Sequence, residues 1–431
     1  MREMKDSGVE WIGEIPADWN IGKTLYALSM PITDGPHETP ELFDEGIPFV
    51  SAEAVSCGNG HIDFEHIRGF ISQDFYEECC KKYIPEMHDI YMIKSGATTG
   101  KVAIVETQKL FTIWSPLAVF RTNPKKCFYE YLYYFIQSDA YQKQIENKWT
   151  YGTQQNIGMR TLEKLMICFP SIDQQINIAD YLDIKCSKID EIIEKQQVII
   201  EKLKEYKLSI ITEAVTSGIN PDVEMKDSGS VWFGSIPTNW EMKRLKYVFH
   251  IQKDIAGEEG HTVLSITQKG IIPKDFSNNE GQFANSYANY QLVHKGDFAM
   301  NHMDLLTGWV DISKYEGVTS PDYRVFVLND KNGMCPEYYL YMMQMCYSAR
   351  IFYGLGQGVS GMGRWRLQAD KFLNFHIPIP PYDEQKIIAD YITDKVNHIE
   401  VEIDKRNKLV EKYQEYKKSL IYEVVTGKKE V

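Results

Sequence analysis

The 431-residue sequence has no long apolar run, no cysteine pair motif and no excess of positive charge. A membrane-spanning helix needs about 18 or more apolar residues in succession, and the opening MREMKDSGVEW has no apolar signal core. We therefore expect a cytoplasmic protein without membrane association. The 8 cysteines are scattered without a CxxC pair, a pattern that favours free thiols over zinc ligands or disulfides.

Positive charge is scarce, because 47 Lys and Arg stand against 60 Asp and Glu and give a net charge of −13. This balance argues against a simple basic nucleic-acid binder. A net charge can hide a local docking face, but residues 24–168 and 245–378 each hold more acidic than basic side chains. Any contact with nucleic acid must therefore come from a minority of side chains, and we expect partner proteins to supply much of the attraction for phosphate.

The strongest pattern in the sequence is an internal repeat. MKDSGVEWIGEIPADW at 4–19 returns as MKDSGSVWFGSIPTNW at 225–240. FPSIDQQINIADYLDIKCSKID at 169–190 returns as IPPYDEQKIIADYITDKVNHIE at 379–400. Each half of the chain therefore has a near-constant opening, a divergent middle and a near-constant ending.

The divergent middles are two versions of one domain. DIYMIKSGATTGKVAI at 89–104 aligns with DFAMNHMDLLTGWVDI at 297–312, and YLY at 131–133 aligns with YLY at 339–341, both at an offset of 208. Short runs with turn residues between them predict strands, and a tyrosine-rich helix follows in each middle. The expected fold class is mixed α+β.

Each near-constant ending predicts a long helix with a heptad seam, since its apolar residues step by four and three. Neither Gly nor Pro interrupts a run of about 44 residues, which spans about 65 Å at 1.5 Å per residue. Polar residues occupy the same two rungs in both copies. The seam positions are Leu182, Cys186, Ile189, Ile193, Gln196, Ile200, Leu203, Lys207, Ile210 and Ala214 in the first helix and Ile392, Val396, Ile399, Ile403, Arg406, Val410, Tyr413, Lys417, Leu420 and Val424 in the second.

The connectivity predicts that the two helices pair antiparallel, with one globular domain at each end and adjacent chain termini, in a pseudo-two-fold arrangement. The alternative is an intermolecular coiled-coil stalk. The predicted segments are domain one at 1–172, helix one at 173–218, domain two at 219–382, and helix two with a tail at 383–431.

Three strings imitate enzyme motifs. FYGLGQG at 352–358 and IPPY at 379–382 resemble the glycine loop and NPPY of methyltransferases, but too little chain separates them and Ile379 has no polar atom for an amino group. PDVEMK at 221–226 resembles a nuclease signature, but its carboxylates are crowded into a linker, whereas a metal site needs groups from neighbouring strands.

KSGATTGKVAIV at 94–105 resembles a phosphate-binding loop and fails as one. Gly96 and Gly100 enclose three residues where a Walker loop has four, and Val102 has no hydroxyl for magnesium. The second copy replaces Lys101 by Trp309. The stretch therefore predicts a strand, a turn and a strand.

The repeat layout, the tryptophan-flanked openings, the helix starts DQQ (173–175) and DEQ (383–385), and TDGPHETP at 33–40 resemble one family over the whole chain. That family is the DNA-specificity subunit of type I restriction–modification enzymes. The resemblance implies that each middle is a target-recognition domain reading one half of a split asymmetric site in double-stranded DNA. It also implies that the helices bind two methyltransferase subunits and that a motor nuclease subunit joins for restriction.

The resemblance implies a non-catalytic chain without a cofactor of its own, with S-adenosylmethionine, ATP and magnesium bound by partner subunits. Two other functions stay open on the residues alone. One is a self-contained DNA methyltransferase or nuclease, and the other is a coiled-coil scaffold without a role on DNA.

Polar loops after the tyrosine-rich helices are the first candidates for base contacts. Arg suits guanine, and Gln or Asn suits adenine, so Gln154, Gln155, Arg364 and Arg366 are the first choices. The alternative is a polar loop that merely closes the domain. The complete candidate set is Lys148, Thr150, Thr153, Gln154, Gln155 and Asn156 in the first loop, Gln357, Ser360, Arg364 and Arg366 in the second, and the weaker candidates His37, Thr39, Lys94, Thr98, Asn301 and His302.

Overall fold

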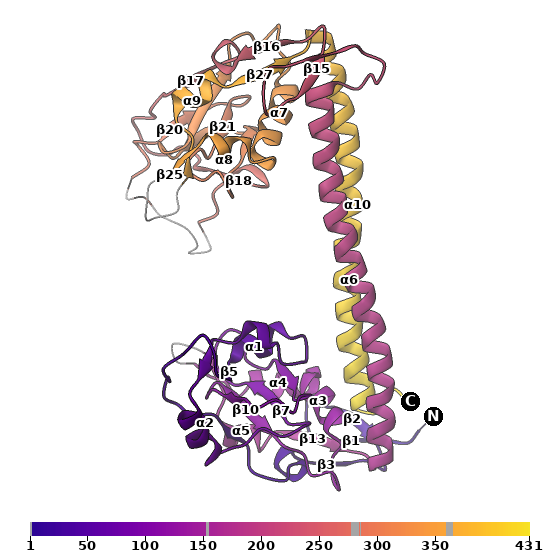
Figure 1. Ribbon diagram of the computed structural model, residues 1–431. Helices are drawn as coiled ribbons and strands as arrows, with labels where there is room; N and C mark the ends of the chain where they lie inside the picture. Colours follow the sequence, from indigo (N-terminus) through magenta and orange to yellow (C-terminus); the bar gives the residue numbers. More distant parts are fainter. Residues whose placement is uncertain (1, 152–154, 277–283, 285, 359–364) are drawn as a thin grey trace. The chain divides into compact units, whose positions relative to one another are not determined.

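The computed structural model describes residues 2–151, 155–276, 284, 286–358 and 365–431. They form two units, of which unit 1 comprises Met1–Gln197 with Lys408–Val431 and unit 2 comprises Val198–Asn407. Each unit holds one divergent middle and a part of each long helix (Figure 1). In the described part of the chain, no helix is both long and apolar enough to cross a membrane.

Unit 1 is built around a four-stranded sheet in the order β4-β10-β7-β8. These strands are β4 (Thr33–Asp34), β10 (Leu117–Phe120), β7 (Ile90–Ile93) and β8 (Val102–Ile104). The other strands are β1 (Met4–Asp6), β2 (Glu14–Pro16), β3 (Asn20–Lys23), β5 (Ile47–Val50), β6 (Phe70–Ile71), β9 (Thr112–Ile113), β11 (Thr150–Tyr151), β12 (Gln155–Asn156) and β13 (Met166–Phe169). The short helices are η1 (Thr24–Ala27), α1 (Ala52–Cys57), η2 (Phe64–His66), α2 (Gln73–Cys80), α3 (Tyr129–Gln137), α4 (Asp139–Glu146) and α5 (Met159–Leu162).

Unit 2 has the matching sheet in the order β17-β24-β21-β22. These strands are β17 (Phe249–Gln252), β24 (Arg324–Leu328), β21 (Phe298–Met300) and β22 (Val310–Ile312). The other strands are β14 (Met225–Asp227), β15 (Ser235–Pro237), β16 (Glu241–Arg244), β18 (Leu264–Thr267), β19 (Gly270–Pro273), β20 (Gln291–Val293), β23 (Gly317–Thr319), β25 (Gln357–Gly358), β26 (Trp365–Arg366) and β27 (His376–Ile379). The short helices are η3 (Leu245–Tyr247), α7 (Pro336–Ser348), α8 (Ile351–Leu355) and α9 (Ala369–Asn374).

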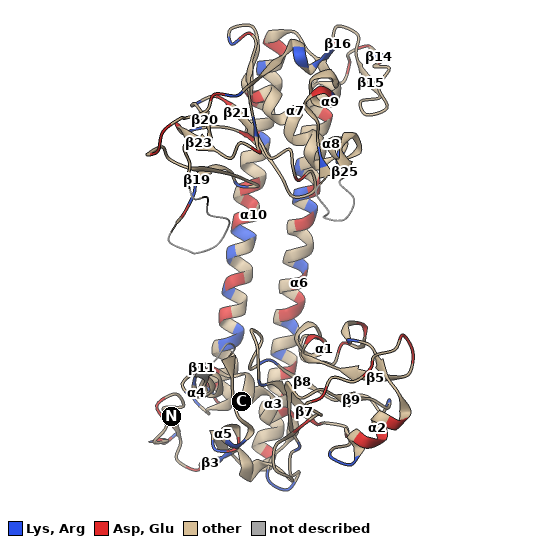
Figure 2. Cartoon of the chain, turned by 90° about the vertical axis from the view of Figure 1, so that its left-hand side faces the viewer, with Lys and Arg blue, Asp and Glu red and all other residues tan. Residues whose placement is uncertain are grey.

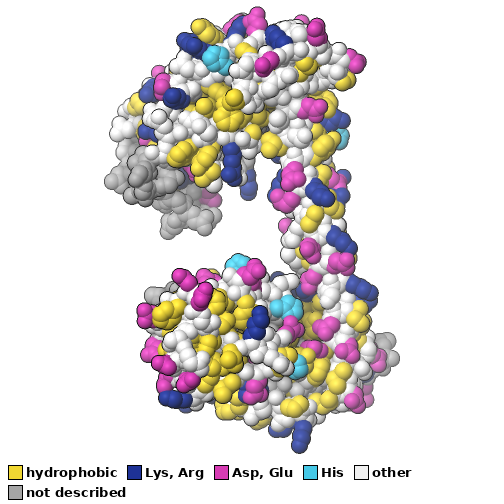
Figure 3. Space-filling model, in the orientation of Figure 1, with side chains coloured by type: hydrophobic (Ala, Val, Ile, Leu, Met, Phe, Trp, Pro, Cys, Tyr) yellow, Lys and Arg dark blue, Asp and Glu magenta, His cyan; other side chains and the backbone are white. Residues whose placement is uncertain are grey.

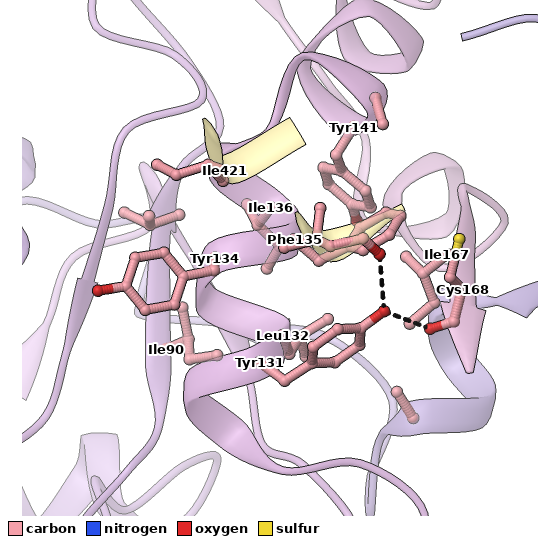
Figure 4. Close-up of a cluster of buried hydrophobic side chains, with 14 of the residues drawn as sticks. Ile90, Tyr131, Leu132, Tyr134, Phe135, Ile136, Tyr141, Ile167, Cys168 and Ile421 are labelled. Atoms are coloured by element: carbon pink, nitrogen blue, oxygen red, sulfur yellow. Dashed lines mark hydrogen bonds between the residues drawn. The ribbon is translucent and has the colours of Figure 1, made fainter. Parts of the chain in front are cut away.

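The central sheet of unit 1 is buried on both faces. Ile90 and Met92 pack into a core with α3 and the long helices, whereas Tyr91 and Ile93 pack into a second core with α1. Side chains of a strand alternate between its faces, so strands buried on both sides are apolar throughout. The first core is stapled by the Tyr131 hydroxyl, which donates to the carbonyls of Cys168 (3.0 Å) and Val425 (3.2 Å) (Figure 4).

The two central sheets confirm the predicted repeat of the middles. Ile90 pairs with Ile104 in unit 1, and Phe298 pairs with Ile312 in unit 2, so that both partners differ by 208. The alignment of the YLY strings is wrong by one residue. Tyr338 donates to the carbonyls of Pro378 and Val215, and thereby takes the place of Tyr131 at an offset of 207. The alignment of the two helices follows from how they pack against the ends of the long helices, and the matching YLY sequence is not a guide to it.

The tyrosine-rich segments differ from the prediction of one helix each. In unit 1, α3 ends at Gln137, and the next residue, Ser138, has an extended backbone (φ −67°, ψ 150°) before α4 begins at Asp139. In unit 2, Arg350 adopts a left-handed conformation (φ 57°) between α7 and α8. A residue in either conformation cannot continue an α-helix, so each segment folds as two helices.

The long helices α6 (Ile172–Ser217) and α10 (Tyr382–Val425) confirm the heptad prediction. Within unit 1 the Lys417 ammonium lies 2.6 Å from Asp190, and within unit 2 that of Lys207 lies 3.1 Å from Glu400. The residue numbers of both pairs add to the same total, as they must where two helices run antiparallel. Lys and Arg are interspersed with Asp and Glu along both helices (Figure 2).

The buried glutamines of the helix starts explain why DQQ and DEQ recur. Gln175 Oε1 accepts the backbone N–H of Phe128 (2.8 Å) before α3, and its Nε2 donates to the carbonyl of Pro170 (3.0 Å). Gln385 makes the same bonds to Cys335 (3.0 Å) and Pro380 (3.0 Å). Each amide therefore joins the start of a long helix to the start of a tyrosine-rich helix.

The tryptophan-flanked openings pack against the helix ends. Gly427 ends α10 with a positive φ of 71°, and a Cβ there would lie 2.5 Å from Pro16 and 3.0 Å from Trp19. Gly218 ends α6 with φ 78°, and its Cβ would lie 3.4 Å from Trp240. The opening of each half thus packs on the helix that ends the other half.

Candidate nucleic-acid interface

The predicted strand, turn and strand occur, but they begin before the stretch 94–105. Strand β7 (Ile90–Ile93) ends just ahead of it, and the stretch holds the turn and β8, which pairs antiparallel with β7. Gly96 has a φ of 95°, and the Thr99 hydroxyl donates to its carbonyl at 2.7 Å. The turn leads into strand β8. A phosphate-binding loop would instead lead into the N-terminus of a helix.

This turn lies against the hairpin β11–β12 in unit 1. The N–H of Gly96 donates to the carbonyl of Gln155 (3.0 Å), and the N–H of Ile157 donates to the carbonyl of Lys94 (2.9 Å). Ser95 forms a bridge with Asn156. The fold therefore brings the hairpin candidates and the weaker candidates of the turn to one end of the central sheet.

A buried carboxylate organises the basic side chains at this end. Asp34 is 1% exposed, and its carboxylate lies 2.5 Å from Lys82 and 3.3 Å from Lys94. His37 Nε2 lies 3.3 Å from the same carboxylate, although its side chain is 72% exposed. We call these four residues the Asp34 centre. Its single carboxylate is the acidic partner of both lysines and offsets one of their two charges.

Unit 2 repeats this arrangement with different side chains. The N–H of Leu367 donates to the carbonyl of His302 (2.9 Å), so His302 stands where Lys94 stands in unit 1. In the hairpins, Asn156 pairs with Thr150 and Arg366 pairs with Gln357, which makes Arg366 the counterpart of Asn156. One backbone frame therefore presents different hydrogen-bonding groups in the two units.

His302 is buried (6% exposed), and its pKa is lowered to about 3. Burial is the largest cause, and the positive charges of Arg324, Arg366 and Lys253 add to it. The imidazole is therefore neutral at physiological pH and serves only as a hydrogen-bonding group. The neighbouring Asn301 is tied to the fold by its carbonyl, which accepts the Tyr347 hydroxyl at 2.5 Å.

The structure places the remaining candidates in three ways. The side chains of Lys148, His37, Thr39, Asn156, Gln357 and Arg366 are exposed, and Gln155 and Thr98 are half-buried. Thr153, Gln154, Ser360 and Arg364 lie outside the described residues, as does the side chain of Thr150. Two of the four first choices therefore have no described position.

Sequence reasoning missed Asp34, Lys82, Lys253 and Arg324. Arg324 begins the apolar strand RVFVL, and a cation inside such a run is the signal that could have found it. Asp34 lies in the quoted TDGPHETP string, but its lysine partners are 48 and 60 residues away in sequence. Nothing local indicates those contacts.

Charge on the two units is mixed. On the face shown in Figure 3, acidic and basic side chains are interspersed over both units. Among the described residues, no group of three or more His, Cys, Asp or Glu side chains is placed to hold a metal ion. The eight cysteines are free thiols.

Two units with one frame and unlike polar side chains at equivalent positions define a modular recognition protein. The type I restriction–modification DNA specificity domain matches residues 36–205 and 237–412, and the chain belongs to this family. It is a DNA-recognition subunit and is not catalytic, since catalysis in type I systems lies in partner subunits.

Two curated relatives come from Methanocaldococcus jannaschii. A protein provisionally named the type I restriction enzyme MjaX specificity subunit is 26% identical, and the match covers 97% of this chain and 95% of the relative's chain. The type I restriction enzyme MjaVIII specificity subunit is 24% identical and covers 85% of each chain. A solved structure from work on complex assembly and conformational transition of the type I system has a TM-score of 0.67 at 12% identity, with 95% of this chain and 98% of that chain covered. This likeness shows a shared fold.

Proposed function

We propose that each unit reads one half of a split, asymmetric site in double-stranded DNA, chiefly through its hairpin and the adjoining turn. The observation that supports this proposal is that equivalent backbone positions carry different side chains in the two units. Asn156 of unit 1 corresponds to Arg366 of unit 2, and Lys94 corresponds to His302. Asn and Gln make paired hydrogen bonds to adenine, whereas Arg makes them to guanine. Asn156 of unit 1 is therefore assigned a contact with an adenine, and Arg366 of unit 2 a contact with a guanine.

The proposed contact set is the predicted one, with its stronger members in the two hairpins. Gln155, Asn156, Gln357 and Arg366 have the described positions that support it, because they lie on β12, β25 and β26. The proposed recognition domains keep the boundaries 1–172 and 219–382. The first spacer helix keeps 173–218, and the second keeps 383–431 together with the C-terminal tail. The helix length would set the number of base pairs between the half-sites.

The long helices are proposed to dock two methyltransferase subunits. Pairs such as Asp190–Lys417 and Glu400–Lys207 are related by the internal repeat, so the helices offer two equivalent surfaces to two identical partners. A motor nuclease subunit would join for restriction. S-adenosylmethionine, ATP and magnesium are assigned to these partners, and the assembly would act in the cytoplasm.

The decisive experiment is methylome sequencing of a host that expresses this chain with a type I methyltransferase partner. The expected result is methyladenine in both halves of one split asymmetric motif. Unmodified DNA in spite of a stable complex would contradict the proposal. Calorimetry of the purified chain with S-adenosylmethionine or Mg²⁺ tests the self-contained enzyme, which predicts measurable heat of binding, whereas we expect none.

A further inference from the structure

Basic side chains gather at the end of the central sheet of unit 2, and the described residues of this unit give them no acidic partner. Strand β10 pairs Ala118 with Asp34 and with Met92 in unit 1. Strand β24 pairs Arg324 with Met300, the counterpart of Met92. The register of Gln252 with Val325 places Lys253 opposite Arg324. Lys253 and Arg324 thus stand where unit 1 has Asp34 and Ala118.

Arg324 carries a buried charge, since the residue is 5% exposed. Its Nη2 donates to the carbonyl of Leu367 (2.9 Å), and its guanidinium carbon lies 4.9 Å from the centroid of the Phe372 ring. Burial lowers the pKa of Arg324 to about 10. No ion pair joins Arg324, Arg366 or Lys253 to a carboxylate within the described ranges. A buried cation without an anion is costly, so an arriving anion would be favoured.

His302 supplies an independent sign of a missing ligand. Its Nδ1 is buried and has no hydrogen-bond partner among the described residues, although the residue is only 6% exposed. Buried polar nitrogens are nearly always paired in proteins. In the tautomer that carries hydrogen on Nδ1, this nitrogen is a neutral donor beside three cations.

The acids nearest in sequence are already engaged. Asp304 Oδ1 accepts the N–H groups of Leu306 and Thr307 (3.0 Å each). The carboxylate of Asp254 accepts Nε2 of Gln252 (2.6 Å). Neither therefore serves the cations as Asp34 serves Lys82 and Lys94.

We propose that Lys253, His302 and Arg324 form a seat for one phosphate of the DNA backbone, beside the base-contacting Arg366. Unit 1 lacks this seat because Asp34 fills the corresponding place. The exposed Lys253 makes the direct contact, and the buried Arg324 and His302 lie behind it. This rests on the proposed function of unit 2 as a reader of DNA. It adds that the two units hold the backbone unequally, since unit 2 holds it more strongly.

The test replaces Lys253 by the residue that unit 1 uses. K253D gives Arg324 an acidic partner, so we expect a melting temperature equal to or above that of the unaltered chain. In the assembly with its methyltransferase partner, we expect weaker DNA binding. The slope of log K against log salt should become shallower by about 1, the change for one lost phosphate contact. The methylated motif should stay the same.

K331D is the matched control, because Lys331 is exposed and follows the opposite end of β24. It makes the same charge change and should leave the salt slope within error. An unchanged slope for K253D with an intact fold would overturn the phosphate seat, and a changed methylated motif would show a base contact in its place. Inorganic phosphate alone should protect the unaltered chain against melting more than chloride at equal ionic strength. Protection lost in K253D without any change on DNA would show a site for free anions and also overturn the proposal.

The same measurements separate the failure of this inference from failure of the proposed function. If the unaltered assembly methylates no split motif, the proposed function fails before any variant is compared. If it methylates one and K253D matches K331D in every readout, only the phosphate seat fails.

Discussion

Two glutamine side chains carry the connection between the long helices and the domains that they support. Gln175 and Gln385 are 1% and 2% exposed, and each accepts one backbone N–H. Gln175 donates to the carbonyls of Lys126 and Pro170, and Gln385 donates to that of Pro380. Replacing either by Ala removes the side-chain partner of these backbone groups. We expect Q175A and Q385A each to lower the free energy of unfolding by about 1–3 kcal/mol, measured by urea titration. Q73A is the control, since Gln73 pairs with Glu77 on the surface, and an equal loss there would refute the role of burial.

His302 predicts a specific sensitivity to acid. Its pKa is about 3 in the folded chain and near 6.5 when unfolded, so below pH 6.5 the unfolded state binds the additional proton. Stability therefore falls as the pH drops, by at most about 1.4 kcal/mol per pH unit. Between pH 7.5 and 5.0 the unaltered chain should lose about 2 kcal/mol more than H302Q, measured by urea titration at each pH. Equal acid losses for H302Q and the unaltered chain would refute the assignment.

Among the elements, the glycines that end the long helices predict a graded cost. Gly427 and Gly218 end the two helices with φ values of 71° and 78°, and Gly229, in the loop between β14 and β15, has a similar φ of 69°. Ala therefore costs about 1–2 kcal/mol at each of the three from the left-handed backbone alone. A Cβ at Gly427 would also press on Pro16 at 2.5 Å, whereas nothing lies within 4 Å at Gly229. We expect G427A to be the most destabilising in denaturant titrations and G229A to report the backbone cost. Equal losses for the two would show that the opening does not pack on the helix end.

The polar rungs of the heptad seam predict a coupling between helices. Lys207 lies 3.1 Å from Glu400, and both side chains are partly exposed. K207E should destabilise unit 2 by bringing two like charges together, and the double variant K207E/E400K should recover most of the loss. We expect a coupling energy of about 0.5–1 kcal/mol from the double-mutant cycle. A coupling energy near zero would show that the apolar seam residues alone fix the alignment of α6 with α10.

The elements that sequence predicts well are those whose signal is long or repeated. The seam from Leu182 to Ala214 sums many small preferences, and the 208-residue offset reappears in the strand register of Ile90 and Phe298. Single residues are harder. The break at Ser138 depends on one extended backbone, and the Asp34 centre joins side chains that are far apart in sequence. Such contacts arise only when the sheet assembles, so no local pattern of residues encodes them.

At the scale of the whole molecule, the internal repeat divides constant from variable parts. The hydrogen bonds of Gln175 and Gln385 to the starts of the tyrosine-rich helices occur in both units, as does the packing of Trp19 and Trp240 on helix ends. The hairpin and sheet-end residues differ, as with Asp34 and Lys253. A frame that is stabilised by constant contacts tolerates exchange of its variable part, since the exchanged segment carries its own core and meets the same supports.

Exchange of one middle is therefore the prediction for the whole chain. Residues 24–168 replaced by the equivalent segment of another family member should give a folded subunit, because that segment packs on the unchanged α6 and α10. Methylome sequencing with the same methyltransferase partner should show that one half of the split motif is altered. The half read by unit 2 and the number of base pairs between the halves should both be unchanged. The reciprocal exchange of 245–378 is the control and should alter the other half alone. A motif unchanged by both exchanges would reduce the chain to a scaffold, and a motif changed in both halves by either exchange would show that the units do not read DNA independently.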